Sequence, residues 1–391
     1  MGNARPLRIP PYFNSSGDDY VLRPLLCLPA IAAGLLALTF FGAGVKAVDP
    51  SGKNAPPAFE LVQQYPSPVI TRSSPGAEDV EYGFEGGSVI KHQGTYHLFT
   101  TEMLSGHYAV KTRLAHWTSR DRIHWERLAT LYESSGDFTG QDPRASLWAP
   151  MPVFNTREDR WDLFYVAYRC APSTKTEWRG NYEGRIWRAV SKQKGEDGLG
   201  GPYEDVGVIL EPDAQSQPWE GLQGTDSFFP YQAGSRWLGF YGSANTEHLP
   251  IEHWRVGLAE APALPGPWKR RSVGNPVNLE KRFAENPVVT QLENGYYVAV
   301  YDNDVDYQNS IGYTWSAPGD GVHWAAGKPI VVQPKGKGFW ADVVRTPLGL
   351  IPEGDGRYTV FYTGYQNPVK PGGHNFGGVG FATLKEAGAP R

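Results

Sequence analysis

Hydrophobic and polar positions in residues 78–391 repeat one pattern of three strands. The pattern opens with a short β-branched strand, continues after a turn with a strand that alternates aromatic and small residues, and closes with a third strand that ends in a polar turn. The five openings read GGSVI, APMPVF, TDSFF, ENPVV and WADVV, and they begin at Gly86, Ala149, Thr225, Glu285 and Trp340. The repeats are spaced 64, 75, 60 and 55 residues apart when they are counted at Val89, Val153, Phe228, Val288 and Val343.

These repeats predict an all-β fold, a five-bladed β-propeller with few helices. A unit of three or four antiparallel strands cannot cover its own apolar faces, so five such units bury them by packing side by side around an axis. A β-sandwich with coincidental repetition is the alternative, although sandwiches rarely show aligned openings. The composition, with 46 Gly, 33 Pro, 21 Tyr and only 3 Met, also favours short strands joined by turns.

The N-terminal 77 residues predict a leader and a linker. Residues 25–44 form an uncharged apolar run that follows basic residues and is followed by Val45-Lys46-Ala47, an ending that resembles a signal-peptidase site. We expect residues 1–47 to be a signal peptide that exports the protein to the periplasm, the medium or the outer surface. The run is also long enough to cross a bilayer, so an uncleaved anchor is the alternative. Residues 48–77 are expected to be a linker to one catalytic domain at residues 78–391.

The charge of the chain limits its expected binding partners, and its cysteine content limits the disulfides it can form. Thirty-seven Lys and Arg stand against 41 Asp and Glu, a formal charge of −4 without the basic excess that binding a phosphate backbone requires. Nucleic acid is therefore not expected as a partner. Cys27 lies in the leader, which leaves Cys170 without an intrachain disulfide partner once the leader is removed.

Carboxylates concentrate at the predicted strand starts that line the central channel. Glu85, Asp226, Glu285 and Asp342 lie at or next to four of the openings, and the second blade has Trp148 instead. Acids that face one another in a confined channel repel and lose solvent, so the pKa of at least one should rise, as a general acid requires. This pattern suits cleavage of a glycosidic bond, in which one carboxyl group protonates the departing oxygen and another activates water or attacks the sugar.

Three openings carry short motifs in the same order along the chain: Trp148-Ala149-Pro150, Thr225-Asp226-Ser227 and Glu285-Asn286-Pro287. With these motifs, residues 80–385 resemble the five-bladed propeller glycoside hydrolases, especially family 43 and its relatives. The resemblance implies that Glu285 is the general acid and that Asp226 tunes its pKa and orients the substrate. It also implies inversion, although a retaining mechanism would make the second acid a nucleophile.

The first blade departs from the pattern of that family. Aligned through Ser88-Val89-Ile90, the position of the general base falls on Gly86, and the nearest acid is Glu85. We expect Glu85 to reach the centre from an offset backbone position and act as base. The alternatives are that Glu102 or Asp142 is the base, or that the fold has lost hydrolysis.

A second group of residues is predicted to contact the sugar: Trp148, Trp340, Tyr241, Asp342 and Arg345. Structural alternatives exist for several residues. Trp148 and Trp340 can pack between blades, Asp226 can cap strand-start amides, and Glu285 can form an ion pair with Arg345.

Metal and cofactor signals are weak. Residues 302–306 begin like a calcium loop, but Tyr307 and Tyr313 stand where Gly and Glu are required, so we expect a solvated loop. The histidines show no metal-ligand spacing. No organic cofactor is expected, and a single metal ion in the channel is left open.

The sequence therefore predicts an exported glycosidase that acts on a plant, algal or microbial oligo- or polysaccharide, with membrane contact only through an uncleaved anchor. A non-catalytic carbohydrate-binding propeller is one alternative. A transglycosylase or phosphorylase on the same fold is another, for which the basic candidates are Arg144, Arg345 and Lys281.

Overall fold

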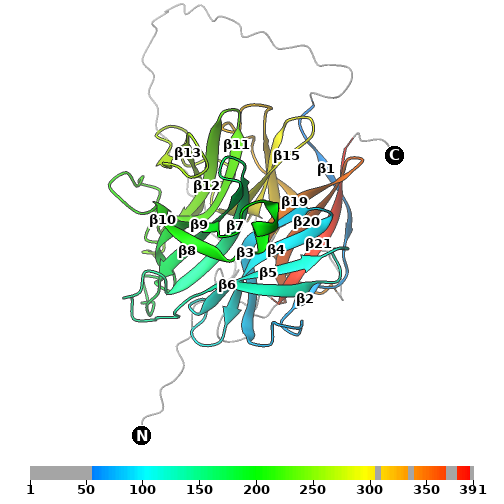
Figure 1. Ribbon diagram of the computed structural model, residues 1–391. Coiled ribbons are helices and arrows are strands. Elements are labelled where there is room, and N and C mark those ends of the chain that lie inside the picture. The colour runs from blue at the N-terminus through cyan, green and yellow to red at the C-terminus, as the bar shows by residue number, and fades with distance from the viewer. Residues whose placement is uncertain (1–54, 304–309, 333–338, 367–376, 388–391) are drawn as a thin grey trace, which may run out of the picture. The chain divides into compact units, whose positions relative to one another are not determined.

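The computed structural model describes residues 55–303, 310–332, 339–366 and 377–387. Within these ranges the chain forms 21 strands and one short 3₁₀ helix, Glu196–Gly200. The strands make five antiparallel sheets, four of which are meanders of consecutive strands, while the fifth adds strands from the N-terminal side (Figure 1). The predicted five-bladed β-propeller is confirmed.

The strands of the five blades follow one another along the chain. Blade one contains β3 (Val80–His92), β4 (Thr95–Leu104), β5 (Thr112–Ser119) and β6 (Glu126–Glu133). Blade two contains β7 (Ser146–Asn155), β8 (Arg160–Arg169), β9 (Tyr182–Ser191) and β10 (Tyr203–Leu210). Blade three contains β11 (Asp226–Ala233), β12 (Arg236–Ala244), β13 (Trp254–Ala261) and β14 (Lys269–Arg270). Blade four contains β15 (Ala284–Gln291), β16 (Tyr297–Asn303), β17 (Ser310–Ser316) and β18 (Lys328–Val332).

Blade five closes the propeller by joining the two ends of the folded domain. It contains β19 (Val343–Gly354), β20 (Arg357–Tyr365) and β21 (Gly378–Glu386), and β21 also pairs with β1 (Phe59–Gln64) and β2 (Ile70–Thr71) from the N-terminal side (Figure 1). The expected linker at residues 48–77 is thus wrong for its second part, which belongs to this blade. Strand β1 looks like a linker in sequence because it is an edge strand whose central side chains are all exposed.

Apolar side chains hold neighbouring blades together. The first strands of the blades, β3, β7, β11, β15 and β19, contact one another in a closed ring. Between blades two and three, Phe164 packs against Phe228 with ring centroids 5.4 Å apart, and between blades three and four Tyr231 packs against Tyr297 at 5.9 Å. Each buried aromatic side chain stabilises the fold by about 1.5–3 kcal/mol. This packing fixes the first strands around the axis.

The predicted leader at residues 1–47 lies outside the described residues. Among the residues that are described, no helix is long and apolar enough to cross a membrane. Cys170 is buried and carries a free thiol.

Candidate active site

The first strand of every blade contains a one-residue β-bulge near its start. In each blade the residue inside the bulge has a left-handed backbone, with φ between 28° and 66°: Gly86, Ala149, Ser227, Asn286 and Thr346. The residue just before it is therefore the structurally equivalent one in all five blades. These equivalent residues are Glu85, Trp148, Asp226, Glu285 and Arg345.

This equivalence corrects the sequence alignment of blade one. Glu85 itself occupies the position of Asp226 and Glu285, so it needs no offset backbone to reach the centre. The bulge of blade one also requires the glycine after it, because a Cβ on Gly87 would lie 1.9 Å from the carbonyl oxygen of Phe99.

Blade five is corrected in the same way. Arg345 occupies the equivalent position, whereas Asp342 precedes β19, is partly exposed and donates its backbone N–H to the carbonyl of Tyr365 (2.9 Å). The blade thus contributes a guanidinium at the bulge position. A β-branched residue with a left-handed backbone, Thr346, follows it and is held there at a cost of about 1–3 kcal/mol.

Arg345 links two buried carboxylates of blade four. Its Nη2 donates to Glu285 Oε2 (2.8 Å), and its Nε donates to Asp302 Oδ2 (2.7 Å). Asp302 lies on β16 directly opposite Glu285 in the strand register, and both residues are buried. The structure therefore brings Glu285 and Arg345 together as an ion pair, which was the structural alternative for Glu285.

The other two acids have longer contacts with neighbouring hydroxyl groups. Thr346 Oγ1 donates to Glu85 Oε1 over 3.3 Å. Ser227 Oγ donates to Asn286 Oδ1 (2.6 Å) and lies 3.1 Å from Oδ1 of Asp226. Contacts from neighbouring blades thus connect the bulges to one another.

Burial shifts the pKa values of these acids upward. Burial raises the pKa of Glu85 to about 7, and the nearby charges of Asp302 and Asp226 add to it, while Arg345 opposes it. Burial likewise raises the pKa of Glu285 well above its usual range against the opposing effect of Arg345. The pKa of Asp226 is also raised by burial, although hydrogen bonds from Tyr168 and Ser227 lower it. Glu85, Glu285 and Asp302 share the single positive charge of Arg345, and Asp226 acts on two of them, so ionising one carboxyl group disfavours ionising the next.

Trp148 and Trp340, two of the residues predicted to contact the sugar, differ in their exposure to solvent. Trp148 occupies the bulge position of blade two, is mostly buried and donates its Nε1–H to Ser146 Oγ (2.5 Å). Trp340 stacks on Tyr362 with centroids 6.1 Å apart and stays partly exposed.

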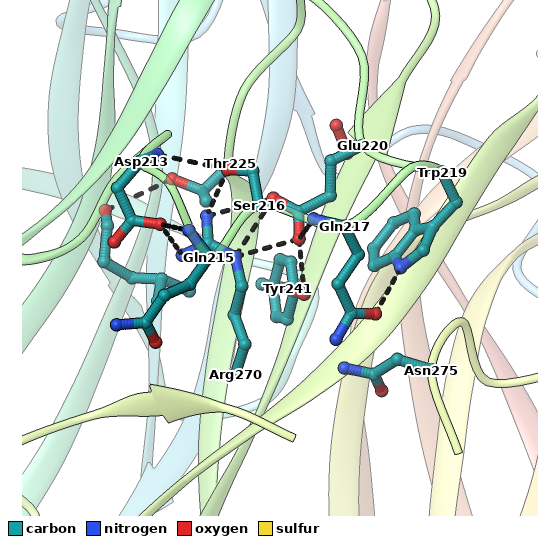
Figure 2. A network of polar contacts seen from close by, with 12 residues as sticks. Asp213, Gln215, Ser216, Gln217, Trp219, Glu220, Thr225, Tyr241, Arg270 and Asn275 are labelled. Carbon is teal, nitrogen blue, oxygen red and sulfur yellow. Dashed lines mark hydrogen bonds and ion pairs between the residues drawn. The ribbon is translucent and has the colours of Figure 1, made fainter. Parts of the chain in front are cut away.

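Tyr241 does not offer a face to a sugar, because it is fully buried. Figure 2 shows it in a polar network in which Glu220 accepts hydrogen bonds from the Tyr241 hydroxyl (2.9 Å) and from Nε of Arg270 (2.8 Å). The structure assigns Tyr241 to blade packing, where its ring also contacts Trp219.

The other two candidates for the base, Glu102 and Asp142, accept hydrogen bonds from residues outside the bulges. Glu102 is fully buried and accepts hydrogen bonds from Arg113, Arg127 and Trp117. Asp142 accepts hydrogen bonds from the Ser135 hydroxyl and from its own loop backbone. Both carboxylates therefore have structural roles.

Asp302 was not among the predicted site residues, although the sequence left open that the acids of residues 302–306 lie on a channel-facing loop and touch substrate hydroxyls. It was expected in a solvated loop, but it is 3% exposed and lies at the end of β16. The remainder of the calcium-like segment, residues 304–309, lies outside the described residues. Among the described residues no group of three or more His, Cys, Asp or Glu side chains is arranged to hold a metal ion.

The basic residues suggested for a phosphorylase are not gathered by the structure. Arg144 pairs with Asp205 (2.6 Å) and lies over the ring of Trp187 in blade two. Arg345 is engaged with Glu285 and Asp302, and Lys281 is exposed.

Comparison with known protein families and with curated proteins yields no match. Solved structures do match over most of the chain. The protein BT0996, in a structure described as a complex with RGII, is 16% identical with a TM-score of 0.62, and the match covers 83% of this chain and 92% of that one. Zg3597, a family 117 glycoside hydrolase from the marine bacterium Zobellia galactanivorans, is 12% identical with a TM-score of 0.54 and coverage of 84% and 90%. A thermostable family-43 glycoside hydrolase is 17% identical with a TM-score of 0.50 and coverage of 79% and 95%. The chain thus shares the fold of propeller glycoside hydrolases, as the sequence motifs predicted.

Proposed function

We propose that the protein is a glycoside hydrolase. The observation that carries this proposal is the placement of three acids at equivalent bulge positions of three blades, with the pKa of each raised: Asp226 and Glu285 are buried, and Glu85 is partly exposed. Fold likeness to family 43 and family 117 glycoside hydrolases supports it.

In the proposed reaction Glu285 protonates the departing glycosidic oxygen. Its raised pKa keeps a proton available for this step. Glu85, as the carboxylate, removes a proton from the water that attacks the anomeric carbon, which inverts the configuration. Asp226 lies between these blades in sequence order, and its charge raises the pKa of Glu285 and orients the sugar hydroxyls. A separation of about 6.5–9.5 Å between the two working carboxyl groups accompanies inversion, and about 5–5.5 Å accompanies retention.

The proposed substrate is a plant, algal or microbial oligo- or polysaccharide outside the cell. One structural neighbour is named as a complex with RGII and another comes from a marine bacterium. For this chain, the apolar run at residues 25–44 supports export. We propose Trp148, Trp340, Asp342 and Arg345 as the residues that contact the sugar.

A carbohydrate-binding propeller without catalysis is the second candidate, and one observation favours it. The Glu285 carboxylate already has an ion-pair partner in Arg345, as a purely structural acid would. In that case the protein binds sugar and never cleaves it.

The test is hydrolysis of a panel of aryl glycosides and of plant and algal oligosaccharides. The native protein is compared with Glu285→Gln and Asp226→Asn. The control is Glu353→Gln, because Glu353 is also a partly buried ion-paired glutamate (2.7 Å to Lys91) but lies at the far end of β19. A hydrolase loses about a hundredfold or more of its rate in the two site variants and none in the control. If the native protein binds sugars but releases none, the binding propeller replaces the hydrolase.

A further inference from the structure

Asp302 stands at a position that is not acidic in the other blades. It pairs in register with the bulge-preceding residue of its blade, and the corresponding partners in the other four blades are Thr101, Val166, Gly242 and Thr363. Blade four alone places a second carboxylate there. Asp302 is also almost completely buried, with only 4% of its side chain exposed.

The guanidinium of Arg345 donates hydrogen bonds to two acids. One edge, at Nε, faces Asp302 (2.7 Å), and Nη2 faces Glu285 (2.8 Å). Without Asp302, the nearest counter-charge of Arg345 would be Glu285 alone. A full positive charge at 2.8 Å would then favour the ionised form of Glu285, which is the wrong form for a group that must donate a proton.

The remaining charged and titratable groups around this pair come from four other strands. They are Glu85 on β3, Tyr168 on β8, Asp226 on β11 and Tyr365 on β20. Glu280, which accepts hydrogen bonds from Tyr301 and Asn303, faces the residues on either side of Asp302. An ionised acid in this set disfavours a further negative charge nearby, and Arg345 interacts with Glu85 and Tyr365 as well as with Glu285 and Asp302.

We propose that Asp302 is a positioning residue that shares the charge of Arg345 with Glu285, and that it thereby keeps Glu285 able to hold a proton at the pH at which the enzyme works. The inference rests on the proposed function of Glu285 as general acid. It adds a fourth carboxyl group, which acts on Glu285 through Arg345 and whose charge also raises the pKa of Glu85.

The experiment measures protonation of Glu285 directly and then through the rate. The full chain is labelled with ¹³C at the glutamate carboxyl, Glu285→Gln assigns the Glu285 signal, and the signal is titrated in the native protein and in Asp302→Asn. Asp302→Glu is the charge-preserving variant. Asp162→Asn is the matched control, because Asp162 is equally buried and paired to an arginine (2.8 Å to Arg188) but lies on β8 away from the bulges.

The proposal expects the titration midpoint of Glu285 to fall by about one pH unit or more in Asp302→Asn, the size of a single charge effect in such sites. Asp302→Glu restores the native midpoint, and Asp162→Asn leaves it unchanged. The pH profile of kcat/KM moves to lower pH by the same amount in Asp302→Asn. At a pH one unit above the alkaline midpoint of the native enzyme, Asp302→Asn is then up to about tenfold slower than the native enzyme.

An unchanged Glu285 midpoint in a folded Asp302→Asn variant overturns the proposal, and so does an Asp302→Glu variant that behaves like Asp302→Asn. Absence of hydrolysis by the native protein, together with a lowered midpoint, contradicts the proposed function and leaves the charge sharing established. The two failures are therefore distinguishable.

Discussion

Glu285 and Asp302 lie opposite one another on β15 and β16, and both accept a hydrogen bond from the same guanidinium, that of Arg345. Buried like charges on adjacent strands are destabilising unless a cation or a proton neutralises them. Here one cation serves two acids and lies within electrostatic range of Glu85 as well. The protonation state of the site is therefore set by a balance among these groups, which makes it testable through pH.

Replacing Arg345 by Gln should move the pH dependence in the direction opposite to Asp302→Asn. The Arg345 charge lowers the pKa of both Glu285 and Glu85, so its loss raises both pKa values. We expect both limbs of the kcat/KM profile to shift to higher pH by about one unit, with a lower maximum if Arg345 also contacts the sugar. Thermal unfolding confirms that the variant is folded. A profile that only decreases in height, without moving, contradicts this electrostatic role.

The acid limb of the same profile should lie near pH 7. The base must be ionised, and the pKa of Glu85 is raised by burial to about 7, so activity rises with pH through that value. The raised pKa of Glu285 moves the alkaline limb to higher pH than an ordinary glutamate would give. A rate profile of kcat/KM between about pH 4 and 10 measures this. An acid limb at about pH 4 to 5 would mean that Glu85 is not the base.

Glu85→Gln should stabilise the protein at high pH while abolishing hydrolysis. An acid whose pKa is higher in the folded state destabilises the fold once it is ionised, so the penalty appears as pH rises from about 4.5 through 7. The amide removes this penalty. We expect a free energy of unfolding about 1–3 kcal/mol higher than native at pH 8, and no difference below pH 4, as measured by urea denaturation. A variant that is less stable at pH 8 would show that the carboxylate is well solvated or fully paired.

Much of the fold was predictable because each blade repeats the same alternation of aromatic and small residues. The positions of the β-bulges in the first strands were not predictable from the sequence. Gly86 and Asn286 favour a left-handed backbone, but Ala149, Ser227 and Thr346 do not, so composition alone does not mark the bulge in blades two, three and five. That uncertainty placed Asp342, instead of Arg345, at the start of blade five.

Part of the candidate site was predictable from the repeat, and the remainder was not. Acids at strand starts identify Asp226 and Glu285, because one residue of misalignment still leaves them near the axis. Asp302 could be found only from the cross-strand register, since it lies near the end of a second strand and its sequence context resembles a loop. The aromatic residue Tyr241 was misplaced because side-chain direction along β12 depends on that register too.

A histidine pair should make blade one sensitive to acid. His97 Nδ1 and His116 Nε2 are 3.0 Å apart, and the His116 ring stacks on Phe99. Burial lowers the pKa of His97 to about 4 and of His116 to about 3, so the unfolded chain binds more protons below about pH 6.5. The contribution of this pair to stability is therefore complete above about pH 6.5 and falls as the pH drops toward 4.

His116→Phe should flatten this pH dependence, because the apolar ring replaces a group that must stay neutral. The melting temperature is compared at about pH 7.5 and pH 5 in the native protein, in His116→Phe and in His124→Phe, whose side chain is 85% exposed. We expect the difference between the two pH values to shrink in His116→Phe only. An equal difference in all three proteins would assign the acid sensitivity to other groups.

The polar network of blade three should contribute stability without touching the reaction (Figure 2). Glu220 and Arg270 are 3% and 4% exposed at their side chains and form an ion pair at 2.8 Å that ties the segment before β11 to the outer strand β14. Glu220→Gln leaves the buried Arg270 with only its longer ion pair to Asp213 (3.3 Å), so it should lower the free energy of unfolding by up to about 3–5 kcal/mol. The matched control is Glu177→Gln, which breaks a more exposed pair with Arg179 (3.0 Å) and should cost at most about 1 kcal/mol. Urea denaturation at about pH 7 measures both variants. If Glu220→Gln changes the pH profile of hydrolysis without changing stability, the network belongs to the site and Tyr241 must be reconsidered as part of it.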